Sequence, residues 1–104
     1  MIEVITAADF DAKVLGSAEP CIAFFAGDND PSANIEKVLN EIFDEGETKE
    51  TVYKINVADA ADLAAEYGAK NPPVLIMFEG GQKGRNMIGY RPKPRVKQLF
   101  ADLA

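Results

Sequence analysis

Residues 71–81 read NPPVLIMFEGG, and this stretch decides the fold. The two prolines near its start hold the chain extended, because a residue that precedes proline avoids the helical region. Residues 74–78 form a continuous apolar run, which is typical of a strand buried on both faces of a sheet. The glycine pair at 80–81 predicts a hairpin turn into a weaker strand through Met87 and Ile88. The stretch therefore predicts two adjacent antiparallel strands.

Outward from this stretch, strand-like and helix-like segments alternate. Further strands are predicted at residues 2–5, 21–25 and 52–57. Helix signals follow Thr6, Asp30, Asp59 and Pro92; the first three of these residues are candidate N-caps, and Pro31 suits a first helical position. The resulting order is βαβαβαββα. Because strands that alternate with helices pair in parallel and the late hairpin adds antiparallel pairs, we expect one α/β domain over residues 1–104, with a mixed central sheet and helices on both faces.

The composition narrows the class of protein. The chain has 104 residues, a formal net charge of −6, one cysteine and no histidine. Since histidine is the usual metal ligand and the usual general base at neutral pH, we expect no metal site and no cofactor. No apolar run approaches the roughly 20 residues of a membrane helix, and residues 1–10 lack the basic start of a secretory signal. A lone cysteine fits a reducing compartment, so we expect a cytoplasmic monomer that binds no membrane.

The charges are distributed unevenly. No acidic residue occurs between Glu79 and Asp102, and this stretch holds six of the eleven cations: Lys83, Arg85, Arg91, Lys93, Arg95 and Lys97. The rest of the chain is strongly acidic, which disfavours nucleic acid as a ligand of the protein by itself. The basic stretch is either a solvated edge or a local surface for an acidic partner.

Several motifs resemble those of the thioredoxin family. Residues 51–56 (TVYKIN) resemble its third strand, and residues 66–70 (EYGAK) lead to Pro73 as a tyrosine–glycine motif leads to proline there. Residues 24–26 (FFA) resemble the segment before its redox motif, and Gly89 falls where the family keeps a glycine beside the active site. The resemblance covers nearly the whole chain and implies a thioredoxin-like fold.

The redox residues of that family are missing. Its W-C-G-P-C motif falls on residues 28–32, which read DNDPS, so Asn29 and Ser32 stand where the two cysteines belong, with Asp30 and Pro31 between them. Disulfide exchange needs a thiolate that attacks and a second thiol that resolves the mixed disulfide. The buried acid of the family's central strand falls on Ala23. The sequence therefore predicts a redox-inactive relative that has no catalytic residues.

The single thiol supports an alternative hypothesis. Cys21 lies eight residues before Asn29, inside an apolar strand, where a cysteine behaves as a small hydrophobic residue. Thiol–disulfide exchange through Cys21 remains the enzymatic alternative, and fast labelling of this thiol in the native protein would support it.

The resemblance also suggests where a partner protein binds. Pro73 matches the family's cis-proline, and the residue before it pairs there with an extended client through its N–H and C=O. That residue is Pro72 here, which has no N–H, so generic peptide binding is expected to be weaker. We expect a protein-binding or adaptor module that uses the former active-site face, or alternatively an assembly chaperone for one client peptide. The expected partner-binding residues are Asp28, Asn29, Asp30, Pro72, Pro73, Gly89, Tyr90 and Arg91.

Overall fold

The computed structural model describes residues 2–46, 48 and 50–103. Within them, one sheet has the strand order β1-β3-β2-β4-β5. Its strands are β1 (Ile2–Ile5), β2 (Cys21–Ala26), β3 (Thr51–Asn56), β4 (Val74–Glu79) and β5 (Gln82–Ile88). β1 and β2 both run parallel to β3, whereas β4 is antiparallel to β2 and to β5. The predicted mixed sheet and the predicted hairpin are confirmed.

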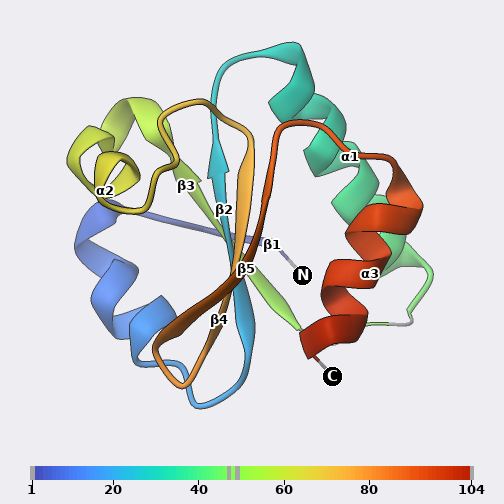
Figure 1. Cartoon of the computed structure of the whole chain (residues 1–104), viewed down its shortest axis with the longest axis horizontal. Coiled ribbons are helices and arrows are strands. Elements are labelled where there is room, and N and C mark those ends of the chain that lie inside the picture. The colour runs from blue at the N-terminus through green and yellow to red at the C-terminus, as the bar shows by residue number, and fades with distance from the viewer. Residues whose placement is uncertain (1, 47, 49, 104) are drawn as a thin grey trace.

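Helical segments cover both faces of this sheet (Figure 1). On one face lie α1 (Asp30–Asp44) and α3 (Lys93–Leu103). On the other lie the short helices η1 (Ala7–Asp9) and η2 (Asp11–Leu15), together with η3 (Val57–Asp59) and α2 (Ala61–Glu66). Two separate apolar clusters fill the spaces between the sheet and these two layers.

The central strand β2 supplies both clusters, because alternate side chains of a strand point to opposite faces. Ile22 and Phe24 pack with residues of α1 and α3, whereas Ala23 and Phe25 pack on the α2 side. All six residues of β2 are buried, as the continuous apolar run predicts.

The first predicted helix differs from expectation. It consists of the 3₁₀ turn η1 followed by the π-helical turn η2, and the Thr6 hydroxyl donates to the Asp9 carboxylate at 3.1 Å instead of capping a backbone N–H. Phe10 and Val14 are nevertheless both buried. Packing of these two side chains, more than helix propensity, therefore sets the local conformation.

Two of the predicted N-caps are also wrong. Asn29, not Asp30, caps α1, because its extended backbone brings its side chain to the N–H of Ser32. Asn56 caps the turn η3 by accepting from the N–H of Ala58, so Asp59 lies inside that turn and not before α2. At α1 an amide side chain accepts the bond that we predict for a carboxylate, whereas α2 begins after Ala60 with no side-chain cap.

Candidate functional site

Three loops meet at one end of the sheet, at the top of Figure 1: the loop from β2 to α1, the loop from α2 to β4, and the loop from β5 to α3. Asn29 of the first loop donates from Nδ2 to the carbonyl oxygen of Pro72 in the second, at 3.1 Å. The N–H of Gly89, at the start of the third loop, donates to the carbonyl oxygen of Pro73 at 2.8 Å. The structure thus brings together Asn29, Pro72, Pro73 and Gly89, as predicted.

The Asn29 side chain uses both ends of its amide. Its Oδ1 accepts the N–H of Ser32 at 3.0 Å, which satisfies one of the free donors at the start of α1. Its Nδ2 makes the bond to Pro72 across 43 residues of sequence. One side chain therefore caps the helix and ties it to the loop before β4.

The Ser32 hydroxyl is also engaged. Ser32 is only 2% exposed, and its Oγ accepts the N–H of Gly27 at 3.0 Å. This bond joins the first turn of α1 to the end of β2. Both positions that the resemblance aligns with redox cysteines therefore hold polar side chains that tie the loop together.

Gly27 and Pro72 are in close contact. A Cβ atom placed on Gly27 would lie 2.4 Å from Cγ of Pro72, closer than any real Cβ approaches another heavy atom. The peptide bond between Pro72 and Pro73 is cis. Only glycine at position 27 leaves room for this proline ring.

The main chain of Pro72 offers little to an extended ligand. Proline carries no N–H, and its carbonyl oxygen already accepts from Asn29. Strand-like pairing at this residue would lack a donor and would have to share the carbonyl oxygen with Asn29. Both main-chain groups of Pro72 therefore favour weak peptide binding.

Exposed apolar and basic groups lie beside these loops. Tyr90 is 46% exposed and Ile88 is 50% exposed. Arg91 is exposed, and its Nη1 donates to the carbonyl oxygen of Tyr90 at 2.8 Å. Asp28 and Asp30 are exposed on the loop that leads into α1. We call Ile88, Tyr90 and Arg91 the Tyr90 patch.

Pro73, one of the expected partner-binding residues, is not on the surface. It is buried, whereas Pro72 is half-buried, so Pro72 alone of the two can contribute apolar surface to a partner. The reason is that Pro73 directly precedes the buried strand β4 and its carbonyl oxygen is paired with Gly89.

Cys21 lies at the other end of β2. Five residue steps of about 3.3 Å each place it roughly 16 Å from Ala26, at the site end of the strand. Its side chain is 1% exposed, and its Sγ lies 3.9 Å from the carbonyl oxygen of Val14. Burial raises the pKa of this thiol, which disfavours the reactive thiolate.

Sequence reasoning missed Gly27 and Ile88 as parts of the site. Gly27 follows the buried strand directly, and we interpreted it only as a turn residue. Ile88 falls at the end of β5, on the sheet face opposite to the buried Met87, where its side chain stays exposed. The alternation of side chains along β5 was the available signal for Ile88.

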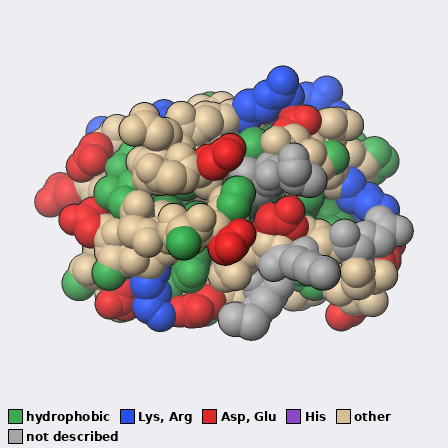
Figure 2. Space-filling view, turned by 90° about the horizontal axis from the view of Figure 1, so that it is seen from below, with side chains coloured by type: hydrophobic (Ala, Val, Ile, Leu, Met, Phe, Trp, Pro, Cys, Tyr) green, Lys and Arg blue, Asp and Glu red, His purple; other side chains and the backbone are tan. Residues whose placement is uncertain are grey.

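The end of the molecule opposite to the three loops carries charges of both signs. Figure 2 shows this end with Asp and Glu side chains scattered across the surface and Lys and Arg mainly near the rim.

Within the described ranges, no group of three or more His, Cys, Asp or Glu side chains is placed to hold a metal ion. Of the helices described, none has the length and apolar character needed to cross a membrane.

The fold and the loop arrangement are those of a thioredoxin-like protein, and comparisons with known proteins agree. The family model described as Thioredoxin matches residues 1–102. The chain is 30% identical over 99 residues to a thioredoxin of Alicyclobacillus acidocaldarius, covering 95% of this chain and 94% of that protein. It is 33% identical over 97 residues to thioredoxin 1 of a Nostoc strain, covering 92% and 91% of the two chains. The chain belongs to the thioredoxin family.

Proposed function

We propose that this chain is a redox-inactive, cytoplasmic member of the thioredoxin family that binds a partner protein through its former active-site face. One observation carries the proposal: Asn29 and Ser32 stand at the positions that the resemblance aligns with the two thiols, and their side-chain polar atoms are hydrogen-bonded within this loop and to Pro72 of the neighbouring loop. The loop is thereby organised as a fixed surface.

The chemistry of the site supports the loss of redox activity. An amide has no nucleophile that ionises near neutral pH, and a serine hydroxyl is far too basic to replace a thiolate. The position of the family's buried acid holds Ala23, which is fully buried among apolar residues. Cys21 is buried at the opposite end of β2, which weakens the alternative of exchange through this thiol.

The surface chemistry supports binding of a folded protein. The Tyr90 patch combines two exposed apolar side chains with a guanidinium, a combination that is common at the centre of protein interfaces. Because Pro72 has no N–H and its carbonyl oxygen is shared with Asn29, an extended client gains little here. This argues for a folded acidic surface as the partner over the alternative of a chaperone for one peptide.

Two experiments test the proposal. The first is reduction of a protein disulfide by the purified chain with dithiothreitol as the electron source; we expect the rate of dithiothreitol alone. The second is affinity capture from native lysate with wild type, Cys21→Ser, Arg91→Glu and Lys37→Glu, with and without reductant. Lys37 is exposed on α1 and makes a matched change of charge outside the Tyr90 patch.

We expect one partner that is retained by wild type, Cys21→Ser and Lys37→Glu, with or without reductant, and lost by Arg91→Glu. A partner that is lost with reductant or in Cys21→Ser would show that the thiol acts, and would contradict the proposal. Equal retention by Arg91→Glu would rule out the Tyr90 patch as the binding surface.

A further inference from the structure

The strand β5 lies at an edge of the sheet and has a free outer side. Among the described strands it pairs with β4 alone, and in Figure 1 it passes in front of the other strands. The Gly89 N–H bonds to Pro73, and Leu75 is opposite Met87, so the main chain of Met87 also points toward β4. Since main-chain groups alternate along a strand, those of Asn86 and Ile88 point outward. This short edge can accept one further strand.

A groove runs beside this edge. Its volume is about 390 Å³, and it separates β5 from α3. Met87 of β5 and Leu99 of α3, which are 8% and 6% exposed, give it an apolar floor. Arg85 of β5 and Arg95 of α3 stand at its sides. A strand added to β5 would place every second side chain over this groove.

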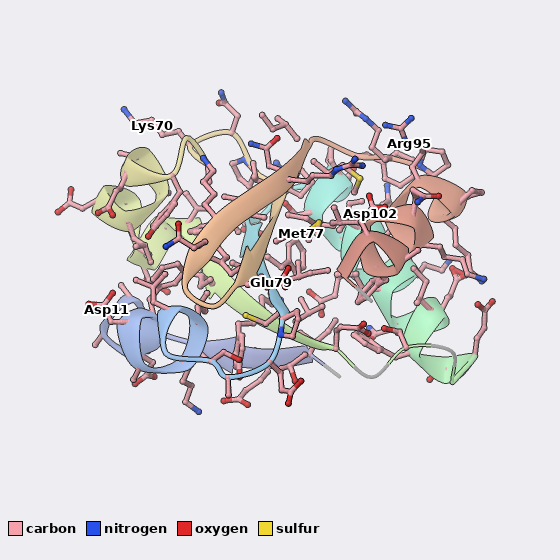
Figure 3. The ribbon with its side chains drawn as sticks, turned by 60° about the horizontal axis from the view of Figure 1, so that its bottom comes forward. Asp11, Lys70, Met77, Glu79, Arg95 and Asp102 are labelled. Atoms are coloured by element: carbon pink, nitrogen blue, oxygen red, sulfur yellow. The ribbon has the colours of Figure 1, made fainter. Side chains whose placement is uncertain are left out.

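The charge of the groove favours an acidic ligand. Arg85 pairs with Asp102 at 2.7 Å, yet it keeps 72% of its side chain exposed. Arg95 is exposed, and no acidic side chain within the described residues pairs with it. Figure 3 shows Arg95 extending away from the body of the molecule, whereas Asp102 lies further along the same helix.

We propose that the β5 edge binds, by strand addition, an extended acidic segment of a partner protein. One apolar side chain of the segment covers Met87 and Leu99, and carboxylates two residues before and after it reach Arg85 and Arg95. Main-chain hydrogen bonds to Asn86 and Ile88 supply the register. This surface includes no residue that ties the loops of the candidate site together, and its anchoring arginines are distinct from Arg91.

A second copy of the chain is a poorer occupant of this edge. Two β5 edges paired with one another would bring Lys83 and Arg85 of both copies together, and like charges on adjacent strands are destabilising. Lysines and strand irregularities also protect natural edges from such self-pairing, and β5 has both, with a register shift between Ile76 and Phe78. The regular part of the edge, residues 86–88, is therefore short. The cations Lys83 and Arg85 lie just before it along β5, which suits an acidic segment.

The test uses a synthetic peptide, acetyl-Thr-Glu-Thr-Leu-Thr-Glu-Thr-amide, titrated into the ¹⁵N-labelled chain. We expect the largest amide shifts at Asn86, Ile88 and residues of the groove, together with affinity that falls as salt rises. The same peptide with lysine in place of glutamate is the charge control. Binding of the lysine peptide with equal affinity, or shifts centred outside β5 and α3, would overturn the proposal.

Two variants separate the contributions of charge and of the strand edge. Arg95→Glu places a carboxylate in the first turn of α3, where a negative charge favours the helix. It should lower the affinity for the peptide roughly tenfold or more. Lys37→Glu should bind as wild type. Asn86→Pro removes an N–H that points outward, which an edge strand tolerates, and should abolish binding while the remaining spectrum persists. Unchanged affinity in Arg95→Glu would refute the groove as the binding site of the peptide.

Arg91→Glu distinguishes this proposal from the proposed function. It should leave peptide binding unchanged, because Arg91 does not line the groove. Loss of partner capture together with intact peptide binding would support two binding surfaces that adjoin at Ile88 and differ in their arginines. Loss of peptide binding in Arg91→Glu would contradict the assignment of the groove.

Discussion

Substitution of Asn29 by alanine tests whether the loop is held as the structure shows. Asn29→Ala removes the N-cap of α1, and a lost cap of this kind costs about 1 kcal/mol. It also removes the bond from Nδ2 to Pro72, and a neutral hydrogen bond contributes about 1 kcal/mol. We therefore expect a loss of about 2 kcal/mol in the free energy of unfolding, equivalent to about 9 °C in Tm for a chain of this length.

The assay is urea unfolding followed by circular dichroism, with Asn29→Asp and Asn40→Ala measured beside Asn29→Ala. Aspartate keeps the acceptor for the Ser32 N–H but cannot donate to Pro72, so Asn29→Asp should lose about half as much, about 1 kcal/mol. Asn40 is exposed within α1, and alanine is the better helix former, so Asn40→Ala should be neutral or slightly stabilising. A loss below about 0.5 kcal/mol in Asn29→Ala would show that neither the cap nor the hydrogen bond to Pro72 stabilises the fold.

Three further predictions follow from burial and charge. Gly27→Ala should destabilise the protein by about 1–3 kcal/mol in urea unfolding, because its methyl group would overlap Pro72; Gly84→Ala, where the nearest atom would lie 3.6 Å away, should not, and equal losses would contradict this contact. Cys21 should react with a thiol reagent at pH 8 only as fast as the protein unfolds, since burial raises its pKa; a rate like that of a free thiol, independent of urea, would be the contrary result. Hydrogen bonds from two lysines of α3 lower the pKa of Glu45, so the folded form binds fewer protons than the unfolded form. The stabilising effect of Glu45 is present above pH 4.5 and should fade as the pH falls through the lowered pKa. Glu45→Gln should therefore reduce the change of the urea midpoint between pH 5 and pH 3, and an unchanged slope would exclude the contribution of Glu45.

The fold could be predicted because its signals are local and redundant. The apolar run at 74–78, the glycine pair after it and the apolar run at 21–25 each specify one strand from within the segment. In this chain, alternation of strands and helices leaves few ways to arrange them. The strands that carry the site were therefore placed from sequence.

The details of the site depend on contacts between distant segments. Residues 28–30 offer three adjacent side chains that can each cap a helix, and sequence alone gives no reason to choose Asn29. The choice follows from the Pro72 carbonyl, which lies 43 residues away and accepts from the side-chain amide of Asn29. A carboxylate at position 29 would have no proton to donate to it. Asp30 is not the cap because it is already the first residue of α1.

Asn29 and Ser32, at the positions that the resemblance aligns with the redox cysteines, act together in holding the loop. The side chains of Asn29 and Ser32 take part in three hydrogen bonds, and these join α1 to Gly27 and to Pro72. Cysteines at the same two positions would remove the side-chain partner of each bond, because a thiol is a weak donor and a weak acceptor. Disulfide exchange and a tightly held loop are therefore alternative uses of the same residues. A loop that is already ordered loses little conformational freedom when a partner covers it, so these three bonds favour the proposed binding surface.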